Sequence, residues 1–99
     1  MNKVTLSKKI TSGGGAASVI FPAKVDFRYE VLHLTVTCDL ATDIQILDGS
    51  NEIWAIQDFI GTFSDDLSGH FYGSKNTPLT CIINNSTAKC SIYMSVQFG

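Results

Sequence analysis

Two histidines are the residues of this chain best suited to acid–base chemistry. His33 lies between two leucines in an alternating apolar run, and His70 lies in the glycine- and aromatic-rich segment 67–73. Nucleophilic catalysis requires a nucleophile, a base within hydrogen-bond reach and a group that orients the base. No Gly-x-Ser-x-Gly motif supplies an activated serine. We therefore expect no enzyme activity, and we expect His33 to be a surface or interface histidine.

The adjacent carboxylates Asp65 and Asp66 are a second chemical candidate. Consecutive strand residues point to opposite faces, so these two side chains diverge unless the backbone bends there. A cation site that includes His70 is one interpretation, and solvated acids at a strand end are the other. The segment Asp48–Glu52 has acidic and hydroxyl residues at the first three ligand positions of a calcium loop, but no glutamate follows at the twelfth. We therefore expect neither a metal nor a cofactor.

Three cysteines, Cys38, Cys81 and Cys90, form an odd set whose spacings of 43 and 9 residues match no zinc pattern. A secreted miniprotein held by disulfides normally has an even and denser set. Each cysteine lies among apolar residues in a predicted strand, where a free thiol behaves as a small hydrophobe. The alternative is a Cys81–Cys90 disulfide, which requires the two residues to face each other in a hairpin.

The charges are distributed unevenly along the chain. The formal net charge of −2 argues against general nucleic-acid affinity, because phosphate neutralisation requires a basic surface. Residues 1–28 contain five Lys or Arg and one Asp, a net of +4, whereas residues 29–99 contain two lysines and eight acids, a net of −6. Such a basic leading segment could dock on an acidic neighbour, including a second copy of the chain. The interpretation we favour is that these charges are scattered and solvated.

The size and composition predict one folded domain. Ninety-nine residues, 44% hydrophobic and 16% charged, suit a single domain, and no run reaches the roughly 18 to 20 apolar residues of a membrane helix. We therefore expect one domain over residues 1–99 with no membrane contact. The glycines Gly13–Gly15 are interpreted as a loop between the first two strands, and a hinge for a basic arm over residues 1–15 is the alternative.

Period-two alternation identifies the secondary structure. In residues 90–98 the even positions are apolar and the odd positions are Ser, Tyr, Ser and Gln, which is typical of a strand with one buried face. In residues 28–38, alternation places Leu32, Leu34, Val36 and Cys38 on one face and a semi-polar set that includes Tyr29, Val31 and His33 on the other. No window has the helical spacing of apolar residues. Both runs are predicted strands.

Shorter alternating runs complete an all-β pattern. Asp48-Gly49 between two of them predicts a tight hairpin turn. The fold expected is an antiparallel two-sheet β-sandwich of about eight strands, jelly-roll-like in architecture. The eight predicted strands are Lys3–Ile10, Ala17–Phe21, Arg28–Cys38, Asp43–Leu47, Glu52–Gln57, Gly61–Leu67, Leu79–Asn84 and Lys89–Phe98.

Aromatic residues supply the remaining candidates for recognition. Trp54, the sole tryptophan, lies in a strand that is apolar on both faces, which indicates core packing or a strand covered by a partner. Aromatic residues are enriched in protein interfaces and would also suit a sugar-stacking site. The aromatic interface or ligand candidates are Tyr29, Trp54, His70, Phe71 and Tyr72.

Residues 31–99 contain an ordered set of short segments that together resemble a known class of protein. An apolar strand ends in Asp48-Gly49, and Ile53-Trp54 and Gly61-Thr62-Phe63 follow it. Next come the segment Gly73–Leu79 with its Gly-x-x-Asn-x-x-Leu spacing, the turn-like segment Asn84–Ala88, and the closing strand Tyr93–Gly99. This order resembles the small virion accessory proteins of tailed bacteriophages, both cement (decoration) and fibre-associated β-sandwich subunits. Cys81 and Cys90 depart from the aliphatic or small residues of that pattern.

The resemblance implies a non-enzymatic structural protein of the phage virion. Its expected partners are the major capsid protein or another virion protein and further copies of itself, most simply as a homotrimer, after assembly in the host cytoplasm. A glycan- or receptor-binding module and a tail or baseplate component are the alternatives. In the capsid reading, the contact candidates are the basic residues of the leading segment, Lys3, Lys8, Lys9, Lys24 and Arg28.

Overall fold

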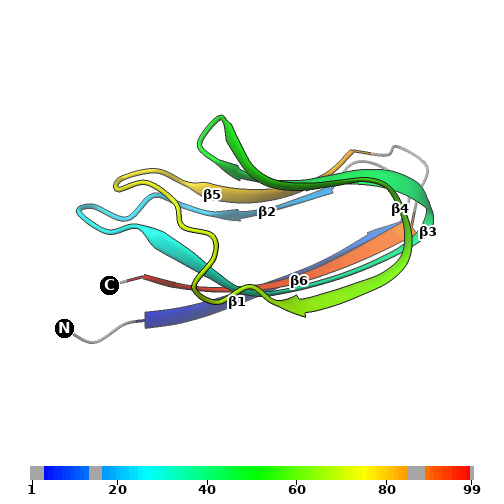
Figure 1. The fold of residues 1–99 in the computed structure, drawn as a ribbon, viewed down its shortest axis with the longest axis horizontal. Coiled ribbons are helices and arrows are strands. Elements are labelled where there is room, and N and C mark those ends of the chain that lie inside the picture. Colours follow the sequence, from blue (N-terminus) through cyan, green and yellow to red (C-terminus); the bar gives the residue numbers. More distant parts are fainter. Residues whose placement is uncertain (1–3, 14–16, 85–88, 99) are drawn as a thin grey trace.

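The computed structural model describes residues 4–13, 17–84 and 89–98 and contains six β-strands in one antiparallel sheet. Across the sheet the order is β1, β6, β3, β5, β2, and β4 pairs with β3 (Figure 1). The described residues include no helix that could span a bilayer. The prediction of an all-β chain is confirmed. The strands are β1 (Val4–Gly13), β2 (Ala17–Phe21), β3 (Tyr29–Asp48), β4 (Asn51–Asp66), β5 (Leu79–Ile83) and β6 (Lys89–Phe98).

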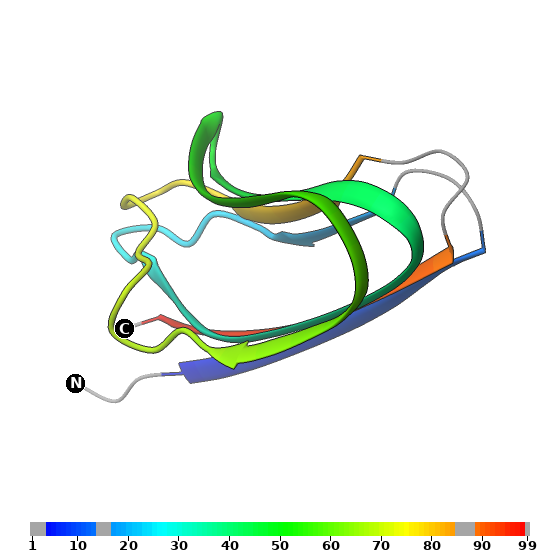
Figure 2. The ribbon, with the colours of Figure 1, turned by 45° about the vertical axis from the view of Figure 1, so that its right-hand side comes forward.

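The long hairpin of β3 and β4 folds the sheet over on itself. The first part of β3, Tyr29–Cys38, pairs with β6, and its last part, Ile44–Asp48, pairs with β5. Because β4 follows β3 along its whole length, the curled hairpin forms part of two facing layers (Figure 2). We call β1, β6, the first part of β3 and the last part of β4 the large layer. The small layer consists of β2, β5 and the remaining parts of the hairpin.

About eight strands in two separate sheets were expected. The structure has six strands in one continuous sheet, which is nearly closed into a barrel. The predicted strands 28–38 and 43–47 are both parts of β3 apart from Arg28, and 52–57 and 61–67 both belong to β4 apart from Leu67. The interruptions between them are bulges rather than loops, since the β3–β4 pairing shifts register near Thr42 and continues. The tight turn at Asp48-Gly49 is confirmed, because Asp48 pairs with Asn51 and Gly49 has a φ of 62°.

Two residues with positive φ bend β4 between the layers. Asp58 has a φ of 53° and its amide donates to Asp43 Oδ1 at 3.0 Å, while Gly61 has a φ of 102°. A φ of 102° is readily accessible only to glycine. A Cβ atom built on Gly61 would meet no atom within 4 Å, so only the backbone conformation restricts this position.

Replacing Gly61 with alanine is expected to lower the free energy of unfolding by about 1 to 3 kcal/mol, the usual range for an L-residue held in a sparsely populated conformation. Urea unfolding followed by circular dichroism measures the change. Thr62→Ala, at the next and exposed position of β4, is the control and should change stability by less than about 0.5 kcal/mol. Equal stability of Gly61→Ala and the unmodified chain would contradict the assigned bend.

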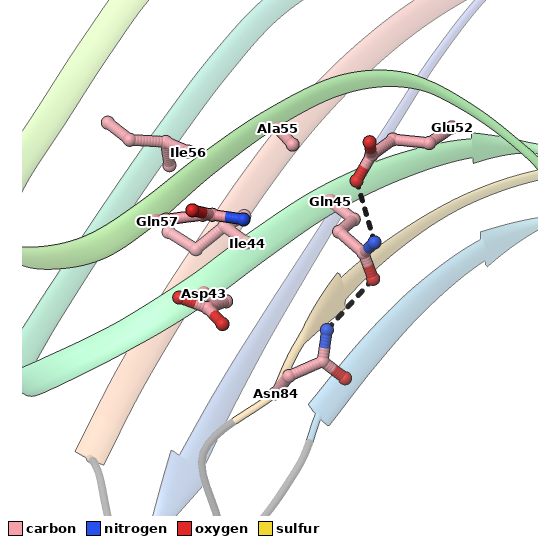
Figure 3. Close-up of a pocket in the computed structure, with 8 residues that line it drawn as sticks. All are labelled: Asp43, Ile44, Gln45, Glu52, Ala55, Ile56, Gln57 and Asn84. Atoms are coloured by element: carbon pink, nitrogen blue, oxygen red, sulfur yellow. Dashed lines mark hydrogen bonds between the residues drawn. The ribbon is translucent and has the colours of Figure 1, made fainter.

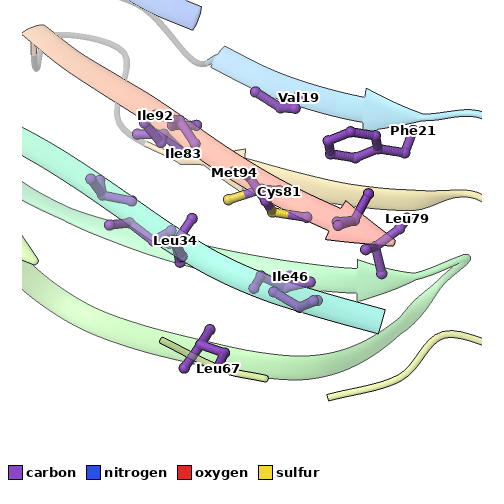
Figure 4. Packing of buried hydrophobic residues seen from close by; sticks show 14 of the residues in the cluster. Val19, Phe21, Leu34, Ile46, Leu67, Leu79, Cys81, Ile83, Ile92 and Met94 are labelled. Atoms are coloured by element: carbon purple, nitrogen blue, oxygen red, sulfur yellow. The ribbon is translucent and has the colours of Figure 1, made fainter. Parts of the chain in front are cut away.

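The core lies between the two layers, and its buried residues come from β2, β3, β5, β6 and Leu67 (Figure 4). Among the described side chains, β1 and β4 add only half-buried ones, such as Leu6 and Phe63. The predicted alternation of residues 90–98 is confirmed, since Cys90, Ile92, Met94 and Val96 are buried. In β3 a register shift between Val31 and His33 reverses the alternation. Tyr29 and Val31 therefore point inward with Leu34, Val36 and Cys38, while Leu32, predicted to be inside, is half-buried.

The leading segment is an integral strand of this sheet. Val4–Gly13 pairs residue by residue with β6, from Val4 opposite Phe98 to Gly13 opposite Lys89. The Lys8 ammonium donates to the Ile20 carbonyl at 2.5 Å and lies 5.3 Å from the centre of the Phe21 ring, so it links β1 to β2. The expectation of a hinged basic arm over residues 1–15 is therefore corrected for residues 4–13; the rest of its proposed hinge lies outside the described residues.

The loop between β4 and β5, residues 67–78, covers one end of the sheet. Its backbone bonds to β3 through Leu67 N to Leu32 O at 2.8 Å and Gly73 N to Tyr29 O at 2.8 Å. The carboxylate of Asp48, at the end of β3, accepts from both the amide and the hydroxyl of Ser74, at 2.9 and 2.6 Å. Asp48 is buried, so these bonds hold the loop to the hairpin from inside the protein.

Candidate interaction surfaces

The outer face of the large layer is rich in hydroxyl groups. Because the even residues of β6 and Leu34 and Val36 of β3 face the core, their neighbours in sequence face outward. Registered pairing places these outward residues in rows across β1, β6, β3 and β4. We call this surface the hydroxyl face; its Ser and Thr residues are Thr5, Ser7, Thr35, Thr37, Thr62, Ser64, Ser91 and Ser95.

Side chains of the hydroxyl face bond to one another across the strands. Ser7 and Ser95 are 3.2 Å apart, and Thr35 and Ser64 are 2.9 Å apart. The His33 Nε2 atom lies 2.9 Å from the Thr35 hydroxyl and 3.2 Å from that of Ser64. Much of the bonding capacity of this face is therefore used within it.

The Ser64–His33 contact is the one that sequence reasoning missed, because only the β3–β4 register brings the two residues together. Ser64 is exposed on an open sheet face, which does not exclude water. Asp66, opposite His33, is also exposed. Hydrogen bonds from the Ser68 hydroxyl and amide lower the pKa of the Asp66 carboxyl. The Ser64–His33 contact is therefore part of a hydrogen-bond network on the surface and does not lie in an enclosed site.

The outer face of the small layer carries four apolar residues set among polar ones. Ile20, Leu47 and Ile82 point away from the core, since the residues on both sides of each in sequence are buried. Ala55 is exposed and lies opposite Gln45. Register places Ile82 opposite Ser18 and Gln45, and Thr80 opposite Ile20 and Leu47. Ile20 is 49% exposed, while Leu47 and Ile82 are half-buried. We call these four apolar residues the apolar face.

A shallow pocket with polar walls borders the apolar face between β3 and β4 (Figure 3). Three side chains form a chain of hydrogen bonds there: Asn84 Nδ2 donates to Gln45 Oε1 at 2.9 Å, and Gln45 Nε2 donates to Glu52 Oε1 at 2.7 Å. An apolar centre beside a polar rim is the usual composition of a protein–protein interface. The pocket is lined by Asp43, Ile44, Gln45, Glu52, Ala55, Ile56, Gln57 and Asn84.

The described basic candidates make different contacts. The Lys8 ammonium bonds to the Ile20 carbonyl and joins β1 to β2. Lys9 is exposed on the hydroxyl face, opposite Tyr93 of β6. Lys24 and Arg28 are exposed residues beside aromatic rings: the Lys24 ammonium lies 5.5 Å from the Phe98 ring centre and the Arg28 guanidinium 4.8 Å from that of Tyr72. Lys3 lies outside the described residues.

The aromatic candidates are divided between the core and the surface. Tyr29 is buried against Phe21 and Phe98 and donates its hydroxyl to the Pro22 carbonyl, so the prediction that it lies at an interface is wrong. The bulge that turns Tyr29 inward is the physical reason. Trp54 packs 5.5 Å from Phe63 on the inner side of β4 and is half-buried.

The other aromatic candidates lie in the loop 67–78. His70 and Phe71 are ring neighbours at 6.4 Å, Phe71 packs against the core, and Tyr72 is 41% exposed. The ring contacts of Trp54 are therefore with β4, and those of His70 are within the loop. These contacts do not assemble a shared stacking site from the described residues.

A metal site is also absent from the part of the chain that the structure describes, where no group of three or more His, Cys, Asp or Glu residues could hold an ion. Asp66 and Asp65 instead accept backbone amides at 2.9 Å, Asp66 from Ser68 and Asp65 from Asp66. Asp48, the first residue of the calcium-like segment, bonds to Ser74. The carboxylates named as candidates therefore cap and join loops.

Comparisons with known proteins give distant structural similarities. No protein-family model and no curated protein sequence matches the chain. Similar solved structures include a protein of the disulfide-linked pili that form Bacillus endospore appendages (11% identity, TM-score 0.49, covering 97% of this chain and 85% of that one). The coat protein of Tobacco streak virus is 9% identical, with a TM-score of 0.44 and coverages of 96% and 85%. The capsid of Helicobacter pylori bacteriophage KHP30 is 10% identical, with a TM-score of 0.41 and coverages of 92% and 92%. With TM-scores below 0.5, these similarities assign the chain to no family.

Proposed function

We propose that this chain is a structural subunit of a phage virion, a cement or decoration protein that binds capsid protein through its apolar face. The observation that carries the proposal is the set of apolar residues on the outer face of the small layer. A sheet face that only meets water normally carries polar residues, but here Ile20, Leu47 and Ile82 point outward. The resemblance of residues 31–99 to phage accessory proteins supplies the class of partner.

The two outer faces suit different roles in this proposal. The hydroxyl face bonds largely within itself, so it gains little from a partner and can remain in water. Burial of the apolar face removes apolar surface from water, which favours association by about 25 cal/mol for each Å². The hydrogen-bonded side chains of Asn84, Gln45 and Glu52 form the polar rim of the contact. A homotrimer on the capsid completes the proposal and multiplies the contacts.

Ile20→Lys is expected to abolish binding to capsids of the virus that encodes this chain, because a charge would be placed in the apolar contact. Tyr93→Lys is the matched control: Tyr93 is 41% exposed on the hydroxyl face, against 49% for Ile20, and its replacement should leave binding within a factor of two. Co-sedimentation of purified chain with capsids measures both. Equal binding by the two variants, or loss only with Tyr93→Lys, would contradict the proposed face.

Two further measurements test the rest of the proposal. The native mass of the unmodified chain is expected to be three times that of one chain. A glycan array is expected to give no reproducible binding. A sugar-specific signal without capsid binding would overturn the structural role in favour of a receptor-binding module.

A further inference from the structure

Two of the three cysteines face each other across the β3–β6 ladder. Cys38 is the direct register partner of Cys90, and both side chains point into the core, with 2% and 3% of their surfaces exposed. Directly opposed residues of an antiparallel pair have Cα atoms about 4.5 to 5.5 Å apart. Disulfides span Cα separations of about 4.4 to 6.8 Å. The backbone therefore already holds this pair at the separation that a disulfide requires.

The two thiols also interact in the reduced protein. Burial, followed by a hydrogen bond with the Cys90 thiol, raises the pKa of Cys38 to about 12. Such a thiol is protonated at neutral pH and reacts slowly, since the thiolate is the nucleophile. The reduced pair is thus compatible with folding in a reducing compartment.

Cys81 provides an internal comparison. Its register partners are Val19 in β2 and Ile46 in β3, so no sulfur lies opposite it. The Cys81–Cys90 pairing considered from the sequence is wrong, because β5 and β6 pair with different parts of β3 and form no hairpin with each other.

We propose that Cys38 and Cys90 form a disulfide when the folded chain meets a disulfide oxidant such as oxidised glutathione. One protein thiolate attacks oxidised glutathione and releases one reduced glutathione. The second protein thiolate attacks the resulting mixed disulfide, forms the Cys38–Cys90 bond and releases the second. Two electrons pass from the protein to the oxidant, and the two thiol protons are taken up by the two glutathione thiolates.

The position of the pair explains how a buried thiol can be reached. Cys90 is the second residue of β6, and Cys38 is the last β3 residue that pairs with β6 before the bend. Moving the start of β6 away from β3 breaks the last pairs of the β3–β6 ladder and the last two pairs of the β1–β6 ladder, while Cys38 stays paired with Gly61 of β4. Strand ends open at lower free energy than the centre of a sheet. Oxidation is therefore expected to be slow in buffer and faster in low concentrations of urea.

The bond would close a loop of about 50 residues, which restricts the unfolded chain more than the folded one. The midpoint of thermal unfolding is expected to rise by about 10 °C after oxidation, and addition of dithiothreitol should reverse the rise. The proposal is independent of capsid binding, because it concerns the isolated chain.

The test uses the full chain treated with oxidised glutathione in dilute urea. Free thiols counted in denaturant should fall from three to one, and peptide mass spectrometry should identify Cys38 joined to Cys90. Cys81→Ala should form the same bond and retain no free thiol. After the same treatment, Cys38→Ala and Cys90→Ala should each form no disulfide within the chain. Neither variant should show a rise in the unfolding midpoint that dithiothreitol reverses.

Three outcomes would overturn the proposal: three free thiols after oxidation, an internal bond that includes Cys81, or bonds between chains only. Circular dichroism of the Ala variants shows whether each is folded. If either fails to fold, the thiol count and the peptide identification in the unmodified chain still decide the question.

Discussion

Replacing Asp48 with alanine is expected to lower the free energy of unfolding by about 2 to 3 kcal/mol. The variant removes both hydrogen bonds that Ser74 donates to this buried carboxylate, and bonds to charged groups contribute about 1.5 to 3 kcal/mol. Urea unfolding at neutral pH measures the loss. Hydrogen exchange of the Gly73 amide should also become faster, because this amide precedes Ser74 in the loop and donates to the Tyr29 carbonyl of β3.

Ser74→Ala is the matched control for this prediction. It removes the hydroxyl donor, at 2.6 Å, and retains the backbone amide donor, so a smaller loss of about 1 kcal/mol is expected. The double variant should be little less stable than Asp48→Ala, since the two changes share one interaction. Additive losses would show that Asp48 stabilises the hairpin by a route other than Ser74.

Stability is expected to decline steeply in alkali because of the buried thiol of Cys81. Burial raises the pKa of Cys81 from 9.0 to about 12. Between these values the unfolded chain releases the proton and the folded chain keeps it, so the contribution is present below pH 9 and is lost as the pH rises. The expected slope is about 1.4 kcal/mol for each pH unit from this thiol. Urea unfolding at intervals from pH 8 to 11 measures it.

The slope distinguishes this effect from a simple loss of packing. Cys81→Ala should be less stable at pH 8, because a buried side chain is shortened, but its stability should fall less steeply with pH. Burial also raises the pKa values of Tyr29 and Cys38, so these two groups contribute to the pH dependence of stability in both proteins. Identical slopes in the variant and the unmodified chain would contradict the prediction.

Alternation alone was enough to predict the strands that do not bend. In β6 every buried position was correctly predicted, because β6 itself has no bulge and its residues alternate between the two faces throughout. The one bulge in the β3–β6 ladder lies in β3, between Val31 and His33. In β3 the same reasoning failed at Tyr29 and Leu32. A bulge adds one residue without changing composition, so it reverses the inward face while leaving the sequence pattern almost unchanged.

The number of strands and the pairing of side chains required the register. Asp58 and Gly61 read as a break in the sequence, yet they bend β4 without ending it. The facing of Cys38 and Cys90 and the contact of His33 with Ser64 join residues far apart in the chain. Only tertiary structure specifies such pairs. The apolar face could have been anticipated from Ile20 and Ile82, which occupy the alternate positions of predicted strands.

The partnership of the first strand with the last sets the order of events during synthesis. β1 has its register partner only in β6, and Val4 lies opposite Phe98. During synthesis β1 therefore has no strand to pair with until residues 89–98 emerge. The β3–β4 hairpin, whose pairs are local in sequence, can form earlier. Completion of this fold therefore follows the synthesis of residues 89–98.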